Sequence, residues 1–295
     1  MKIWMILALI ASTLGTHARA EDLSSLDITA NTSSTSSYVQ LLITDPTGRQ
    51  TGLQFASGPN IQNIPGSSYF PESIDNEETG EAGTQIVRFG MNPVASGNYT
   101  IILIGLANRS YSMNIDGNDS NGNPTNFTST VFTGYLGAGT SQQFVLPFNS
   151  APGAANKITK TVTFDLLRQE VHTAFLLSEI GDKKFAEELE DLLAQGQKAL
   201  DRKDRDDRDH HHDGDDGHGK QKAIDALRQF ISQVDQAAKE KSNQDHDRDH
   251  DRDHKRFATS TAAQSLTSDA KTLIQQLEGQ PGKDHDHHGQ DNEGH

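Results

Sequence analysis

The order of apolar and polar residues divides the chain into two halves with different periodicities. Between residues 38 and 148, short runs rich in β-branched and aromatic residues alternate with clusters of Gly, Asn, Asp and Pro. Such a pattern is typical of antiparallel strands joined by turns. From about residue 162 the apolar residues recur at spacings of three and four, which places them on one face of a helix. We therefore predict a β-sandwich at residues 38–150 and an all-α helical bundle at residues 158–279.

Seven strands are predicted, at residues 38–44, 50–55, 85–89, 98–105, 109–116, 126–133 and 142–148. Residues 99–104 form the most apolar run and are the expected central strand, and residues 45–48 (Asp-Pro-Thr-Gly) are expected to form a turn. Residues 58–83 are rich in Gly and Pro and are expected to be an excursion between sheets. Residues 21–37 are rich in Ser and Thr and are expected to be a flexible lead-in.

Four apolar stripes predict four helices, at residues 166–180, 185–200, 223–238 and 262–277. Gly181 and Asp182 are expected to separate the first two helices. Short amphipathic helices are not stable singly, so we expect these four to pack together.

Low-complexity insertions rich in His and Asp separate the later helices, at residues 201–221 and 243–256, and a similar tail follows at residues 280–295. We expect disordered loops and a disordered tail in these runs. Lengthening a loop in this way is inexpensive, because closure entropy grows only with the logarithm of loop length.

Eleven of the thirteen histidines lie in these three runs. Imidazole is a ligand for Zn²⁺, Ni²⁺ and Cu²⁺, and the interspersed carboxylates also accept Ca²⁺. The predicted metal ligands are His210, His211, His212, Asp213, His218, His246, His250, His254, His285, His287 and His288. The alternative is that the runs are only solvated, solubilising spacers.

The N-terminal residues match a secretory signal peptide. Lys2 precedes the apolar residues 3–10, and Ala18-Arg19-Ala20 supplies a small-x-small cleavage pattern. The apolar run is shorter than the roughly 18–20 residues that span a bilayer. We expect cleavage near Ala20 and a protein that is periplasmic or extracellular, with no membrane span.

Composition narrows the possible chemistry. The chain has no cysteine, which excludes disulfides, thiolate metal sites and cysteine nucleophiles. Its formal net charge of −15 repels phosphate backbones, so nucleic acid is not an expected partner. Residues 116–123 have part of the spacing of a calcium loop, but a hairpin turn explains them better. His172 is expected to be a surface or satisfied core residue.

Parts of both halves resemble known bacterial modules. Residues 41–49, 64–69 and 93–100, the last with a Pro-x-x-x-Gly-x-Tyr-Thr pattern, are similar to pre-peptidase C-terminal and immunoglobulin-like (Ig-like) β-sandwich domains of secreted proteins. Residues 223–234 and 270–274 resemble FIMAH, a small helical module of bacterial extracellular proteins. These resemblances imply an accessory or binding role outside the cell and transfer no active-site residues.

The sequence contains no Gly-x-Ser-x-Gly, His-Glu-x-x-His or Walker pattern. We therefore expect a secreted, non-enzymatic binding or adhesion-type accessory protein with metal-binding loops. Its expected partners are divalent cations and an unknown extracellular protein or glycan. The alternative is a structural or interaction module whose charged runs are spacers.

Overall fold

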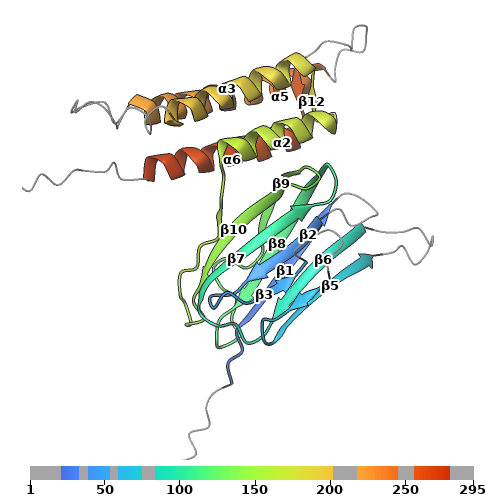
Figure 1. The fold of residues 1–295 in the computed structure, drawn as a ribbon, viewed down its shortest axis with the longest axis vertical. Coiled ribbons are helices and arrows are strands. Elements are labelled where there is room, and N and C mark those ends of the chain that lie inside the picture. Colours follow the sequence, from blue (N-terminus) through green and yellow to red (C-terminus); the bar gives the residue numbers. More distant parts are fainter. Residues whose placement is uncertain are drawn as a thin grey trace, which may run out of the picture.

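The computed structural model describes residues 21–32, 39–53, 59–74, 84–201, 218–244 and 256–279. Figure 1 shows a pair of antiparallel sheets with a layer of helices lying across one end of them. The prediction of a sandwich-like β domain combined with four helices is confirmed at this level.

Two sheets build the β domain. The first has the strand order β5 (Ser67–Ile74), β6 (Thr84–Met91), β1 (Ser25–Thr32), β8 (Arg109–Asn118), β9 (Thr130–Leu136). The second has the order β11 (Thr159–Lys160), β10 (Ser141–Phe148), β7 (Gly97–Gly105), β2 (Val39–Thr44), β3 (Gln50–Gly52), β4 (Ile61–Gln62). Neighbouring strands in both sheets run antiparallel.

The core of the β domain lies between the two sheets. Alternate residues of β7 and β8 are buried, among them Ile101, Leu103, Met113 and Ile115. This period of two is the one expected for strands with one face turned inward. β7 pairs with both β2 and β10, so the prediction of a central strand at residues 99–104 is confirmed.

The boundaries predicted for the β domain are partly wrong. Residues 25–32, predicted as part of a flexible lead-in, form β1, which pairs with both β6 and β8 inside the first sheet. Residues 67–74, predicted as part of an excursion, form β5 at the sheet edge. Residues 159–160, predicted within the helical part, form β11 and pair with β10. The strands predicted from residue 85 onward are confirmed, although the strand predicted at residues 126–133 lies at Thr130–Leu136.

The predicted turn after β2 is confirmed and is held by one carboxylate. Asp45 Oδ1 accepts hydrogen bonds from the backbone N–H groups of Thr47 and Arg49, both at 2.9 Å, and Oδ2 accepts one from Arg49 Nε at 2.7 Å. Burial alone would raise the pKa of Asp45, but the hydrogen bonds from Thr47 and Arg49 outweigh it and lower the pKa below 3.8.

In the part of the chain that the structure describes, four helices follow the β domain: α2 (Phe164–Leu176), α3 (Lys183–Asp201), α5 (His218–Gln244) and α6 (Ser260–Gly279). Each of the four predicted stripes lies largely on one of them. Thr163 caps α2 by accepting a hydrogen bond from Leu166 N at 3.1 Å, and Thr259 caps α6 by accepting one from Ala262 N, also at 3.1 Å.

The predicted break between the first two helices is confirmed. Gly181 belongs to β12 (Ile180–Gly181), which pairs with β13 (Phe257–Ala258), and Asp182 has a positive φ of 71°. The predicted insertions are too long at their helical edges, because residue 201 belongs to α3 and residues 218–221 and 243–244 belong to α5.

The helices share a second hydrophobic core, which also includes Tyr135 of β9. Gly196 of α3 lies at a close approach in this core: a Cβ atom there would be 2.5 Å from the Phe164 ring and 3.4 Å from Cβ of Ala226. The absence of a side chain at Gly196 therefore allows α2 and α5 to pack against α3.

Polar contacts join the helices to the edges of both sheets. Tyr135 of β9 donates a hydrogen bond to Glu179 Oε2 at 2.6 Å, and Gln276 of α6 donates one to the backbone oxygen of Lys160 at 3.0 Å. Lys160 of β11 extends its side chain to Glu170 of α2 and Asp269 of α6. The layer of helices therefore lies against β9 and β11, the edge strands that the two sheets present on this side.

Replacing Asp45 by Asn should destabilise the fold in a pH-dependent way. A carboxylate whose pKa is lowered by folding stabilises the protein above its unfolded pKa, and that stabilisation is lost as the pH falls. We expect Asp45→Asn to lower the free energy of unfolding by about 2 kcal/mol at neutral pH. Urea denaturation should show the difference from wild type shrinking below about pH 4. A difference that is constant from neutral to acidic pH would contradict this account.

Replacing Gly196 by Ala should test the close approach of the helices. Alanine is the better helix former by roughly 1 kcal/mol, but the added methyl group meets the Phe164 ring, so we expect a net loss of about 1–3 kcal/mol. Gly279→Ala, where nothing lies within 4 Å of the added Cβ, is the matched control and should change stability by less than about 0.5 kcal/mol. Thermal denaturation of both variants measures the contrast, and equal melting temperatures would refute it.

Candidate functional site

Most of the predicted metal ligands lie outside the described residues. These are His210, His211, His212, Asp213, His246, His250, His254, His285, His287 and His288. His218 is described and is the exposed first residue of α5. Within the described ranges, no group of three or more His, Asp or Glu side chains is arranged to hold a metal ion. The metal site at the His-rich runs therefore stays a prediction.

The helix ends next to the first His/Asp-rich run and next to the His/Asp-rich tail lie at the same end of the helical layer. Gly219 lies against the last turn of α3, since a Cβ atom there would be 2.7 Å from the backbone oxygen of Ala199. Near the end of α6, Glu278 is 3.5 Å from Arg228, in the first half of α5. The end of α3, the start of α5 and the end of α6 therefore come together on one side of the molecule (Figure 1).

The residues that follow the His/Asp-rich run between α5 and α6 are held at the opposite end of the helices. Arg256 forms an ion pair with Glu188 of α3, and its guanidinium lies 5.6 Å from the centroid of the Phe185 ring. Phe257 then pairs with Gly181 in the short sheet of β12 and β13. The start of the segment that leads into α6 is thus anchored by a packed arginine and a pair of short strands.

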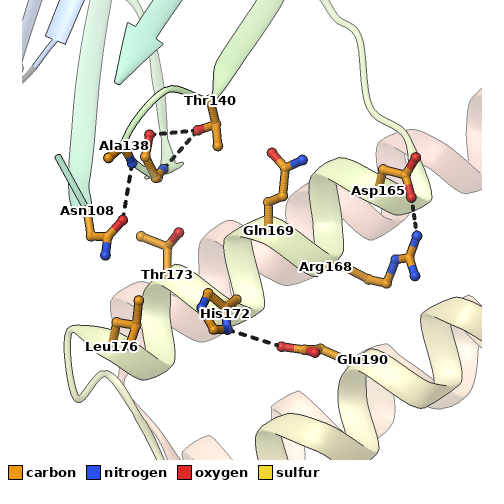
Figure 2. Close-up of a pocket in the computed structure, with 11 residues that line it drawn as sticks. Asn108, Ala138, Thr140, Asp165, Arg168, Gln169, His172, Thr173, Leu176 and Glu190 are labelled. Carbon is orange, nitrogen blue, oxygen red and sulfur yellow. Dashed lines mark hydrogen bonds and ion pairs between the residues drawn. The ribbon is translucent and has the colours of Figure 1, made fainter. Parts of the chain in front are cut away.

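A cleft of about 480 Å³ lies where the helices meet the β domain (Figure 2). One wall is the end of the sheets, with Asn108 and the turn at residues 137–140, and the other wall is the exposed face of α2. Glu190 of α3 closes one side, and Leu176, whose exposed fraction is 49%, supplies apolar surface.

Most polar groups of the cleft already have partners within the protein. Asn108 Oδ1 accepts a hydrogen bond from Ala138 N at 3.2 Å, and Asp165 is paired with Arg168 one turn later in α2. Nδ1 of His172 lies 3.7 Å from Glu190 Oε1, and these side chains are 63% and 35% exposed. The prediction that His172 lies on the surface is confirmed. The cleft offers amide, hydroxyl, imidazole and carboxylate groups to a polar ligand, but solvent surrounds its charged groups.

The loop with partial calcium spacing is a turn, as expected. Asp119 Oδ1 accepts hydrogen bonds from the backbone N–H groups of Asn121 at 2.9 Å and Asn123 at 3.0 Å. Asp116 Oδ1 accepts one from Ser129 N at 2.7 Å. These carboxylate oxygens are used to hold the backbone.

A buried group of charged side chains was missed by the sequence analysis. Lys160, Glu170 and Asp269 come from β11, α2 and α6, and each side chain is at most 5% exposed. A signal was present for the two acids. Glu170 follows Leu167 by three positions, and Asp269 follows Leu266 by three, so both acids lie on the apolar stripes of their helices.

Comparison with known proteins gives no relatives: no family model, no curated protein and no solved structure matches the chain significantly. None of the helices that the structure describes has the length and apolar character needed to cross a membrane.

The pair of His172 and Glu190 should contribute little to stability, because both side chains are largely solvated. We expect a double-mutant cycle of His172→Ala and Glu190→Ala to give a coupling energy of about 0.5 kcal/mol or less. Denaturant titration of the two single variants and the double variant measures it. A coupling above about 1 kcal/mol would mean that the pair is held more rigidly than its exposure indicates.

Proposed function

We propose that this chain is a secreted, non-enzymatic binding or adhesion-type accessory protein whose His/Asp-rich runs bind divalent cations. The imidazoles suit Zn²⁺, Ni²⁺ or Cu²⁺, and the carboxylates also accept Ca²⁺. The sandwich and helices act as the scaffold, and the target is an extracellular protein or glycan. Export follows from the signal-peptide pattern of residues 1–20, with cleavage near Ala20.

One observation carries the proposal. The helices that flank the first run already contact each other, with Gly219 packed against the Ala199 carbonyl. The sixteen residues at positions 202–217 are therefore not needed to span a distance between α3 and α5. A run that the scaffold does not require, and that contains three consecutive histidines among aspartates, is best explained by its ligand chemistry.

The Ig-like character of the β domain is part of the proposal and has a local argument in its favour. The hydroxyl of Tyr99, near the start of β7, donates a hydrogen bond to the backbone oxygen of Ala95 at 2.8 Å. A tyrosine that bonds to the backbone a few residues upstream is a hallmark of Ig-like sandwiches. Gly97, with φ of 146°, brings the backbone against Pro46, where a Cβ atom would be 2.5 Å from that ring. The helical layer is proposed to be a FIMAH-like module on the resemblance of its sequence.

Metal binding is tested by calorimetric titration of the exported chain with Zn²⁺, Ni²⁺, Cu²⁺ and Ca²⁺. We expect micromolar uptake of a transition metal, since imidazole ligands without fixed spacing give modest affinity and low selectivity. Replacing the histidines of the three runs by Gln should abolish the uptake while circular dichroism and melting temperature stay unchanged.

The matched control replaces Arg202, Arg205, Arg208, Arg248 and Arg252 of the same runs by Gln and leaves every histidine. Arg256, which pairs with Glu188, is kept. Uptake should persist in this variant. If wild type takes up no metal at micromolar concentrations, or if the histidine-free variant binds as well as wild type, the runs are spacers and the proposal is wrong.

A further inference from the structure

An amine and two carboxyl groups meet in a part of the structure that solvent does not reach. Lys160 Nζ lies 3.1 Å from Glu170 Oε1 and also contacts Asp269 Oδ2. The three side chains are 5%, 0% and 5% exposed. They come from β11, α2 and α6, and 109 positions of sequence separate Lys160 from Asp269. The contact therefore joins the β domain to the last helix.

The surroundings of this group are tightly closed. The ammonium lies over the ring of Tyr111, 5.7 Å from its centroid. That ring in turn lies on Gly134 of β9, where a Cβ atom would be 2.7 Å from the ring. Gln276 donates a hydrogen bond to the backbone oxygen of Lys160 at 3.0 Å and fixes the strand against α6. The ammonium and the two carboxyl groups are thus held in place by the sheet, by α2 and by α6.

The charge balance leaves one carboxyl group to act as an acid. One ammonium cannot neutralise two carboxylates, and an unpaired charge is expensive to bury. Burial raises the pKa of Glu170; the Lys160 ammonium opposes this, but the neighbouring Asp269 carboxylate raises the pKa further. The ion pair of Lys160 and Asp269 therefore favours the protonated form of Glu170.

We propose that Lys160 and Asp269 become joined by an intramolecular amide bond, formed by the protein itself with Glu170 as the catalytic acid and base. The group supplies each part that such a condensation requires. Lys160 is the nucleophile, the carboxyl carbon of Asp269 is the electrophile, and Glu170 touches the amine and can move protons between them.

The reaction is balanced without a further reactant. Burial alone would lower the pKa of Lys160, but the neighbouring carboxylates raise it, so the ammonium does not readily lose its proton to solvent. The free amine arises instead when the ammonium passes a proton to Asp269 within the group. Lys160 Nζ then attacks Cγ of Asp269 while Glu170 gives a proton to the departing oxygen and takes one from the nitrogen. A C–N bond forms, a C–O bond breaks and the oxygen leaves as water. An ammonium and a carboxylate become one amide and one water, with no change in oxidation state.

Two physical factors favour the amide here. Fixed contact of the two groups replaces an encounter in solution, which is worth a high effective concentration. The product also removes a positive and a negative charge from a place where both are costly to keep. The exposed pair of Lys183 and Glu187 has a similar separation, 3.3 Å, but its side chains are 77% and 59% exposed and solvent stabilises its ions. Burial, in addition to proximity, therefore distinguishes Lys160 and Asp269 from the exposed pair.

The amide would also take a role that this chain cannot give to a disulfide, because it contains no cysteine. It would close a covalent ring that includes α2, α3, α5 and the first half of α6. Cross-links that close long loops restrict the unfolded chain strongly. A secreted protein gains resistance to unfolding in this way.

The test is the intact mass of the exported, denatured protein, with its N-terminus determined. We expect a mass about 18 Da below the value calculated from the sequence, because one water is lost. Tandem mass spectrometry of a digest should find one branched peptide that contains Lys160 and Asp269. A wild-type mass equal to the calculated value overturns the proposal outright, because denaturation separates any ion pair but not an amide.

Variants locate the bond and its catalyst. Glu170→Gln keeps the shape of the side chain but cannot exchange the proton, and Lys160→Met removes the nucleophile, so both should have the full calculated mass. We also expect both to melt on the order of 10 °C lower than wild type. Lys183→Met is the matched control and should keep the loss of one water. If wild type lacks one water but Lys160→Met lacks it too, the bond lies elsewhere and the assignment is wrong.

Discussion

Charge that is shielded from solvent joins the two parts of this protein. Lys160 ends the second sheet, while Glu170 and Asp269 lie on the first and last helices, and none of the three side chains is more than 5% exposed. Removing one partner from such a group leaves an uncompensated buried charge, at a cost of about 3–5 kcal/mol. The arrangement is therefore satisfied only when β11, α2 and α6 are all in position. Folding of the sandwich and packing of the helices are coupled through this contact.

A second contact fixes the orientation of the helices on the sheets. Tyr135 reaches from β9 to Glu179, and Thr259 Oγ1 donates to the same carboxylate oxygen at 3.0 Å. The backbone N–H of Thr259 also donates to the Glu179 carbonyl at 2.8 Å. One acidic residue thus links β9, the end of α2 and the start of α6. Two separated points of attachment, at β9 and at β11, resist rotation in a way that one contact could not.

The helices of this protein can be predicted from local sequence better than its strands, for a physical reason. A helix shows its buried face within a dozen residues, so the four stripes and the break at Gly181 and Asp182 were predictable. β1 shows only the short alternation of Leu26, Ile28 and Ala30 within a Ser/Thr-rich segment, and it is stabilised by strands that lie far away in the sequence. Neighbour order in the sheets and short edge strands such as β11 depend on those distant contacts. Local patterns do not contain that information.

The same distinction applies to the polar groups. Glu170 and Asp269 could have been noticed as acids on apolar stripes, but the lysine that faces them is set by tertiary packing alone. The His/Asp-rich runs are the opposite case, since their chemistry is visible in the sequence while the scaffold makes no demand on it. Because α3 and α5 already meet at Ala199 and Gly219, the run between them can change its composition without altering the helices. The interior group, by contrast, makes a strict demand on its residues, because its side chains are at most 5% exposed and come from three elements of the fold.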